Sequence, residues 1–243
     1  MFSFFKRNKI STFDFLGIDC HSHIIPQIDD GSNSFETSLE ILERLKTIGF
    51  DGFIFTPHIY PDFYPNSQKT IANGFENLKN KLDQSKFYGK LDFAAEYFVD
   101  QNFDKLISDD NLLVFGKNYV LIEISLYSWP LNLEKIIFLL LAKGYQPILA
   151  HPERYCYLEN HLAVIKNLLN LGCLIQINLL SFVGFYGAGS IKLANDMMNE
   201  HVPSFLGTDV HNIQQMALLE KMTKNSLVMQ RLSKYNWENK NLL

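Results

Sequence analysis

The chain has 243 residues, of which 47% are hydrophobic and 20% charged, and its formal net charge is −4. This length suits one α/β domain or two small ones, and the mild acidity argues against a nucleic-acid-binding protein, which usually carries a basic excess. The longest apolar run, residues 136–142, is far shorter than the roughly 20 residues of a membrane span. The first ten residues hold no apolar segment of signal-peptide length. We therefore expect a cytoplasmic protein without a transmembrane segment.

Short apolar runs alternate with amphipathic stretches along the chain, which predicts βα units and a parallel sheet. The predicted strands are residues 15–21, 52–58, 91–98, 119–125, 146–152, 173–179 and 203–209. The predicted helices are residues 34–50, 67–84, 131–143, 160–171, 189–200 and 212–232. No GxGxxG or Walker A segment follows a strand, so a nucleotide-binding fold has no support. Seven strands favour a single-domain barrel over an open sheet.

Histidines and acids gather where these predicted strands end. In a (β/α) barrel the carboxyl ends of the strands converge on one face, where active sites form. Five of the seven histidines lie at such ends, and only His161 and His201 do not. The strand-end side chains, together with one acid from the "DDG" loop, are His21, His23, Asp30, His58, Glu96, Glu123, His151, Asp209 and His211.

Each of these pieces has an ordinary explanation when it is taken alone. The pair His21 and His23 could be two residues on one face of a strand, "HPER" a turn with a solvated ion pair, and "DVH" a helix N-cap. Glu123 within the apolar "VLIEIS" is harder to explain, because a buried acid must be paired or coordinated. Taken together, the pattern favours a metal site.

Charge balance supports metal ions at this predicted mouth. Asp30, Glu96, Glu123 and Asp209 would repel one another and resist ionisation without cations between them. Three divalent ions would leave an excess of about +2 over the four carboxylates, which suits a phosphate dianion. A cysteine nucleophile of the Cys-x5-Arg type is excluded, because no arginine stands six positions after any of the three cysteines.

The motifs "DCHSHIIPQIDDG", "FTPHIYPDFYPN", "AAEYF", "LIEIS", "LAHPERY" and "FLGTDVHN" together resemble the PHP (polymerase and histidinol phosphatase) superfamily. The resemblance runs from about Asp19 to about Asn212 and is greatest to the bacterial PHP-type protein-tyrosine phosphatases of capsule and exopolysaccharide operons. Two positions depart from the family pattern: Gln27 stands where glycine is frequent, and Cys20 where an aliphatic residue is common.

The resemblance implies a distorted (β/α)7 barrel of the PHP type over residues 17–243, preceded by an N-terminal extension over residues 1–16. It also implies a trinuclear centre of divalent ions, for which the ligand chemistry suits manganese, iron or zinc, with manganese expected. The implied ligands are His21, His23, Glu96 and Asp209 for one ion, Glu96, Glu123 and His151 for a second, and Asp30, His58 and His211 for a third.

A metal-bridging hydroxide is the nucleophile that this centre implies. Arg154 is the expected catalytic cation, since guanidinium matches phosphate in two places, although it could instead form a surface pair with Glu153. Tyr60, Phe63 and Tyr64 could wall a slot for phosphotyrosine or simply pack their loop.

The expected activity is hydrolysis of phosphotyrosine on the tail of a cognate bacterial tyrosine kinase. A small-molecule phosphatase such as histidinol phosphatase and a catalytically silent PHP binding module are the alternatives. Phe2, Phe4, Phe5, Lys6, Arg7 and Lys9 could touch an anionic membrane, or the segment could be a frayed extension.

Overall fold

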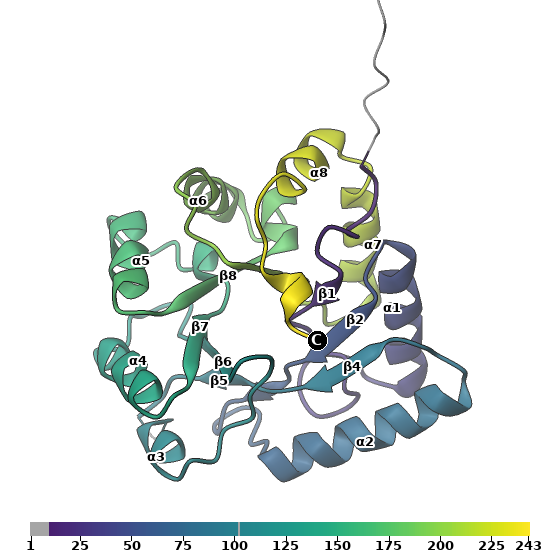
Figure 1. Cartoon of the computed structure of the whole chain (residues 1–243), viewed down its shortest axis with the longest axis horizontal. Coiled ribbons are helices and arrows are strands. Elements are labelled where there is room, and N and C mark those ends of the chain that lie inside the picture. Colours follow the sequence, from purple (N-terminus) through teal and green to yellow (C-terminus); the bar gives the residue numbers. More distant parts are fainter. Residues whose placement is uncertain (1–9, 102) are drawn as a thin grey trace, which may run out of the picture.

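A computed structural model describes residues 10–101 and 103–243 of the chain (Figure 1). Its strands are β1 (Ile18–Asp19), β2 (Gly52–Phe55), β3 (His58–Ile59), β4 (Lys90–Phe93), β5 (Glu96–Phe98), β6 (Tyr119–Glu123), β7 (Gln146–Leu149), β8 (Leu174–Asn178) and β9 (Phe205–Gly207). Its α-helices are α1 (Phe35–Thr47), α2 (Gln68–Gln84), α3 (Phe103–Ser108), α4 (Leu133–Ala142), α5 (His161–Asn170), α6 (Ala188–Asn199), α7 (Ile213–Met222) and α8 (Ser226–Leu232). Short 3-10 helices cover Pro152–Arg154, Leu179–Val183 and Asn239–Asn241.

The strands pair in parallel in two sheets, with the orders β1-β2-β4 and β3-β5-β6-β7-β8-β9. β2 and β3 are two halves of one strand, interrupted where Pro57 lacks the N–H that a ladder needs. β4 and β5 are likewise divided at Ala94, although Ala94 N still donates to Phe55 O over 2.8 Å. Seven strand positions result, each followed by at least one helix.

The ring of strands closes between β1 and β9. Just beyond both strands, Ser22 and Val210 form a parallel bridge, and His23 N donates to Val210 O over 3.0 Å. At the other end, the buried Asn239 side chain bonds to the backbones of Ile18 and Leu206. The prediction of a single-domain, distorted (β/α)7 barrel is therefore confirmed.

The helices form an outer ring around the strands (Figure 1). α1 is an example: its residues Ile41, Leu42 and Leu45 form an apolar face that is buried against the barrel. The Ser34 hydroxyl accepts from Thr37 N and caps the start of this helix. α3 was not among the predicted helices, because its six residues are too few for a clear helical periodicity. The single helix predicted over 212–232 was also wrong, because Asn225 caps a separate helix, α8.

The described end of the expected N-terminal extension is packed. Phe13 and Leu16 are fully buried, and the Phe13 ring stacks on Phe50 with centroids 5.5 Å apart. The possible membrane contact of residues 2–9 lies outside the described residues. Within the described part of the chain, no helix is both long enough and apolar enough to cross a membrane.

Candidate metal centre

All nine predicted ligands lie together at the carboxyl ends of the strands, and seven of them line a cavity of about 770 Å³. These side chains are far apart in the sequence, but the parallel barrel brings the carboxyl end of every strand to the same face. Five of the nine residues are buried, and the more accessible Asp30, His58, Glu123 and His211 lie towards the cavity. The structure therefore confirms that the predicted residues converge on one face of the barrel.

The innermost group consists of His21, His23, Glu96 and Asp209. Nε2 of His21 lies 3.2 Å from Glu96 Oε2 and 3.4 Å from Asp209 Oδ1, and Nε2 of His23 lies 3.4 Å from each of the same two oxygens. The two imidazole nitrogens are 3.3 Å apart. Four ligands bound at about 2.1 Å in a tetrahedron are separated by about 3.4 Å, so this spacing fits one divalent ion.

Glu96 reaches a second group through its other oxygen. Its Oε1 lies 2.9 Å from His151 Nε2, which is 3.9 Å from Glu123 Oε2. His58 joins this group as well, because its Nδ1 lies 3.1 Å from Glu96 Oε2 and 3.0 Å from Glu123 Oε1. The carboxylate of Glu96 thus faces two candidate positions, as expected of a bridging ligand.

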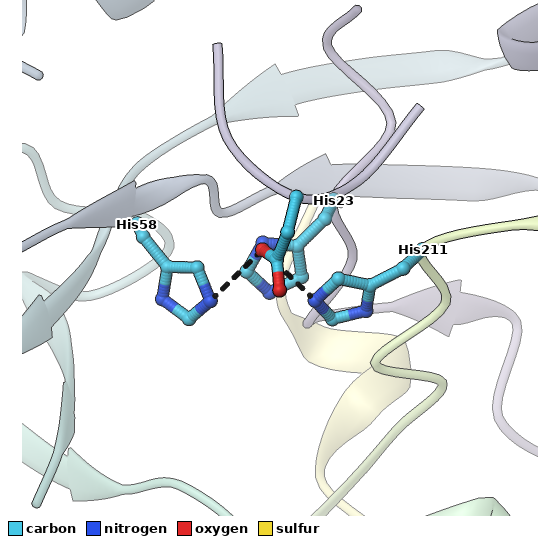
Figure 2. Close-up of side chains that lie close together, drawn as sticks. His23, His58 and His211 are labelled. Carbon is cyan, nitrogen blue, oxygen red and sulfur yellow. Dashed lines mark ion pairs between the residues drawn. The ribbon is translucent and has the colours of Figure 1, made fainter. Parts of the chain in front are cut away.

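A third group surrounds Asp30 at the surface of the cavity. Its Oδ1 lies 3.5 Å from Nε2 of His58 and 3.6 Å from Nε2 of His211, and Figure 2 marks these two ion pairs with dashed lines. His23 is part of the same group, with its ring centroid 4.0 Å from that of His211. The resemblance implies that His58 binds the third ion alone, whereas its two nitrogens face two groups.

The loop "DDG" fixes the orientation of His23. Asp29 Oδ2 lies 2.8 Å from Nδ1 of His23, so Nδ1 carries the proton and Nε2 is left for an ion. Asp29 also accepts from the backbone N–H groups of Gly31 and His58. Gly31 is required because a Cβ there would lie 2.1 Å from His23 O. Asp29 therefore orders the loop around Gly31 through three hydrogen bonds.

β8 contributes two side-chain amides beside the candidate ligands, and these residues were not predicted from the sequence. Gln176 Oε1 accepts from Nδ1 of His21 over 2.9 Å, and Gln176 Nε2 donates to Asn178 Oδ1 over 2.9 Å. Asn178 Nδ2 then donates to Asp209 Oδ2 over 2.6 Å, and the Tyr186 hydroxyl donates to the same oxygen over 3.1 Å. Two residues of one strand therefore orient two candidate ligands, and the other oxygen of Asp209 faces the innermost group.

Arg154 lies on the wall of the cavity. Its Nη1 is 3.3 Å from Asp209 Oδ2, and its guanidinium lies 4.6 Å from the centroid of the Tyr186 ring. The alternative of a surface pair between Arg154 and Glu153 is wrong. Glu153 is fully buried and accepts from Asn178 N and from the Ser181 hydroxyl. These hydrogen bonds hold the "HPER" turn against the end of β8 and the 3-10 helix after it.

The electrostatics of the centre call for cations. Burial opposes protonation of His21, yet the carboxylates of Glu96 and Asp209 raise its pKa to about 9. Burial would raise the pKa of Glu96, but the imidazoles of His21 and His58 hold it well below its usual value. Among the described residues, the buried atoms Nδ1 of His58 and Oε2 of Glu96 have no hydrogen-bond partner. Divalent ions would satisfy these lone pairs and the negative charge together.

Three residues around the centre adopt left-handed backbone conformations that non-glycine residues rarely take. They are Gln27 (φ 65°), His151 (φ 36°) and Asp209 (φ 51°). The conformation of Gln27 gives a physical reason for the glycine that is frequent at this position in the resembling family. Two strained residues are candidate ligands, and such strain concentrates at functional sites.

A parallel barrel with imidazoles and carboxylates clustered at the carboxyl ends of its strands is typical of one class of protein, the metal-dependent (β/α) barrels. Within that class, the family described as capsular polysaccharide synthesis, CpsB/CapC, matches residues 17–236. The match covers most of the chain, and the protein belongs to this family.

Individual relatives agree with the family match. CapC of Staphylococcus aureus is 27% identical over 209 residues, which cover 86% of this chain and 82% of CapC. The tyrosine-protein phosphatase CpsB of Streptococcus agalactiae serotype V is 26% identical over 208 residues, covering 81% of this chain and 83% of CpsB. Among solved structures, those of YwqE from Bacillus subtilis and CpsB from Streptococcus pneumoniae have the same fold. The matching chain has a TM-score of 0.79 and 24% sequence identity, and the match covers 91% of this chain and 89% of the matching chain.

Proposed function

We propose that the protein is a metal-dependent protein-tyrosine phosphatase that hydrolyses phosphotyrosine on proteins. The observation that carries this proposal is the aromatic wall of the cavity above the convergent imidazoles and carboxylates. The names of the relatives support it, since CpsB of Streptococcus agalactiae is a tyrosine-protein phosphatase and the similar solved structures are of metal-dependent tyrosine phosphatases.

The aromatic wall is built from the loop after β3 and from β5. Tyr60 stacks on Phe98 with ring centroids 3.8 Å apart, and Phe63 lies 4.8 Å from Tyr60. Tyr64 stacks on the candidate ligand His58 at 5.2 Å. All of these rings line the cavity, and Tyr60 and Tyr64 also pack the loop against itself. The proposed role in substrate binding is that the same rings would offer flat apolar contacts to an aryl phosphate.

We propose that the nine convergent side chains hold three divalent ions, of which manganese is the expected element and iron or zinc the alternatives. The ligand sets are those implied by the resemblance, with His58 shared between the second and third ions and His23 near the third. When bound, such ions would activate water and neutralise the charge of the phosphoryl group.

The chain's own residues would position the substrate. Arg154 would donate to the equatorial phosphoryl oxygens, and its contacts with Asp209 and Tyr186 hold the guanidinium at the cavity wall. The wall rings would hold the phenyl group, which places the ester oxygen away from the metal centre as the leaving group. The tyrosine-rich tail of a bacterial tyrosine kinase is the proposed physiological substrate, and the cytoplasm the proposed location.

A rate comparison tests the proposal. The manganese-reconstituted protein should hydrolyse a phosphotyrosine peptide with a higher kcat/KM than histidinol phosphate or the matching phosphoserine peptide. Faster turnover of histidinol phosphate would reject phosphotyrosine as the substrate. Absence of hydrolysis of any aryl phosphate by protein with a full metal complement would instead favour a silent binding module. Elemental analysis of the same sample would count and identify the ions.

A further inference from the structure

A second cavity, of about 480 Å³, lies beside the catalytic pocket and is mainly apolar. It is formed by the 3-10 helix Leu179–Val183 and the turn after it, together with α6 and α7. Its walls include the side chains of Val183, Phe185, Ile191, Leu218 and Met222, and Lys221 stands at its rim. None of these residues has a part in the proposed chemistry. Phe185 alone among them also lines the catalytic pocket.

The local backbone explains why Phe185 lines both cavities. The 3-10 helix ends at Gly184, whose φ of +84° is left-handed and which has Ile191 Cδ1 only 3.1 Å from an added Cβ. After this turn the Phe185 side chain remains 45% exposed. Its ring packs edge-on against Tyr186 at 4.8 Å, and Tyr186 contacts Arg154 and Asp209. The apolar cavity is therefore joined to the phosphate-binding end of the catalytic pocket through two successive rings.

We propose that this second cavity is a docking subsite for an apolar side chain of the phosphotyrosine-bearing polypeptide, close in sequence to the phosphotyrosine. The proposal rests on the proposed function. Phe185 lines both cavities, so a polypeptide held by its phosphotyrosine that crosses this part of the rim would bring a neighbouring side chain to the second cavity. The apolar walls of that cavity fit an apolar side chain. Lys221 favours an acidic residue beside the apolar one.

A peptide series tests the subsite. One leucine is placed in turn at each of about four positions on either side of phosphotyrosine in an otherwise serine-rich peptide, because about 3.4 Å per residue of extended chain limits the reach. We expect one position to raise kcat/KM about tenfold, mainly through a lower KM, since the leucine is buried only when the peptide is bound. Val183→Ser should remove this gain but leave turnover of p-nitrophenyl phosphate, which is too small to reach the second cavity.

Matched variants make the result specific. Leu227→Ser changes a leucine that is 79% exposed on α8 and does not line the cavity, so it should keep the full gain. Lys221→Glu should reverse a preference for an acidic neighbour of the leucine, which gives an independent readout if Val183→Ser fails to fold. Thermal melts of each variant establish folding.

Three outcomes would overturn the subsite: no leucine position raises kcat/KM, the gain survives in Val183→Ser, or Val183→Ser changes the oligomer mass measured by light scattering. The last result would mean that a second copy of the chain covers the cavity. Failure of the proposed function is distinguishable, because it would appear either as faster turnover of histidinol phosphate than of every phosphotyrosine peptide or as no hydrolysis of any aryl phosphate.

Discussion

At the scale of single residues, Arg154 is the one permanently cationic side chain among the described residues that line the catalytic pocket. Burial would lower the pKa of Arg154, but Asp209 raises it, so its charge is constant. The same carboxylate fixes one side of the guanidinium while the Tyr186 ring covers a face of it. A cation held this firmly needs little reorganisation when charge develops on a phosphoryl group.

Arg154→Ala should therefore lower kcat on a phosphotyrosine peptide by about 10²–10³-fold, the usual effect of losing one preorganised donor. Metal content should stay unchanged, because Arg154 contacts Oδ2 of Asp209, whereas the other oxygen, Oδ1, faces the innermost group. Arg154→Lys should recover part of the loss. Arg44→Ala, which changes an arginine paired with Glu220 outside the pocket, is the control. An unchanged kcat in Arg154→Ala would remove this residue from the mechanism.

Protons and ions compete for the buried imidazoles. The pKa of His21 rises from its ordinary 6.5 to about 9 in the ion-free fold, so the protonated ring stabilises that fold fully below pH 6.5 and loses this effect as the pH rises through 9. Metal ions need the neutral ring. Stabilisation by added Mn²⁺ should consequently increase between pH 6.5 and 9, as measured by thermal melts with and without a chelator. The same stabilisation at both pH values would show that His21 does not bind an ion.

At the scale of secondary-structure elements, β8 holds none of the candidate ligands but orients two of them, His21 and Asp209, through hydrogen bonds. Gln176 and Asn178 are two positions apart, so their side chains lie on the same face of the strand. The amide of Gln176 is oriented by Asn178, and this orientation makes its oxygen the acceptor for His21. Such partners of metal ligands typically contribute a factor of 10–100 in metal affinity.

Gln176→Leu should weaken Mn²⁺ binding by about 10–100-fold, measured by competition with a chromophoric chelator in the purified protein. The physical reason is that the His21 ring loses the partner that fixes its tautomer. Gln146→Leu is the matched control, because Gln146 also bonds through its amide, but to Gly172 O at the opposite end of the neighbouring strand. Equal affinities in the two variants would limit Gln176 to a packing role.

These elements also show how far sequence can predict the structure. The candidate ligands at the strand ends could be predicted, because His21, Glu96 and Asp209 are polar residues that follow or interrupt apolar runs. Gln176 and Asn178 could not be identified in this way, since buried amides give no signal distinct from ordinary strand residues. The double role of His58 depends on side-chain orientation, which spacing does not encode. The helix α3 is short, and its stability comes from tertiary packing of residues such as Phe103 rather than from periodicity.

At the scale of the whole molecule, the barrel depends on its closure between the first and last strands. Near the metal centre the closure is direct, with Asp209 N donating to His21 O over 2.8 Å. At the opposite end, Asn239 is fully buried and its amide replaces a strand pairing. Its Nδ2 donates to Ile18 O over 2.9 Å and to Leu206 O over 2.7 Å, and its Oδ1 accepts from Leu206 N over 3.1 Å.

Asn239→Leu keeps the approximate size of the side chain but leaves the N–H of Leu206 and the carbonyl of Ile18 buried without partners. We expect the free energy of unfolding to fall by about 3 kcal/mol, measured by urea denaturation of the ion-free protein. Asn241→Ala, at an exposed position of the same 3-10 helix, should leave the urea midpoint unchanged. Phosphatase activity of the folded, metal-loaded variant should persist at low temperature, because the direct bonds beside His21 and Asp209 remain. An unchanged midpoint in Asn239→Leu would mean that the amino end of the barrel closes through apolar packing alone, with Leu242 against Ile18 and Phe205.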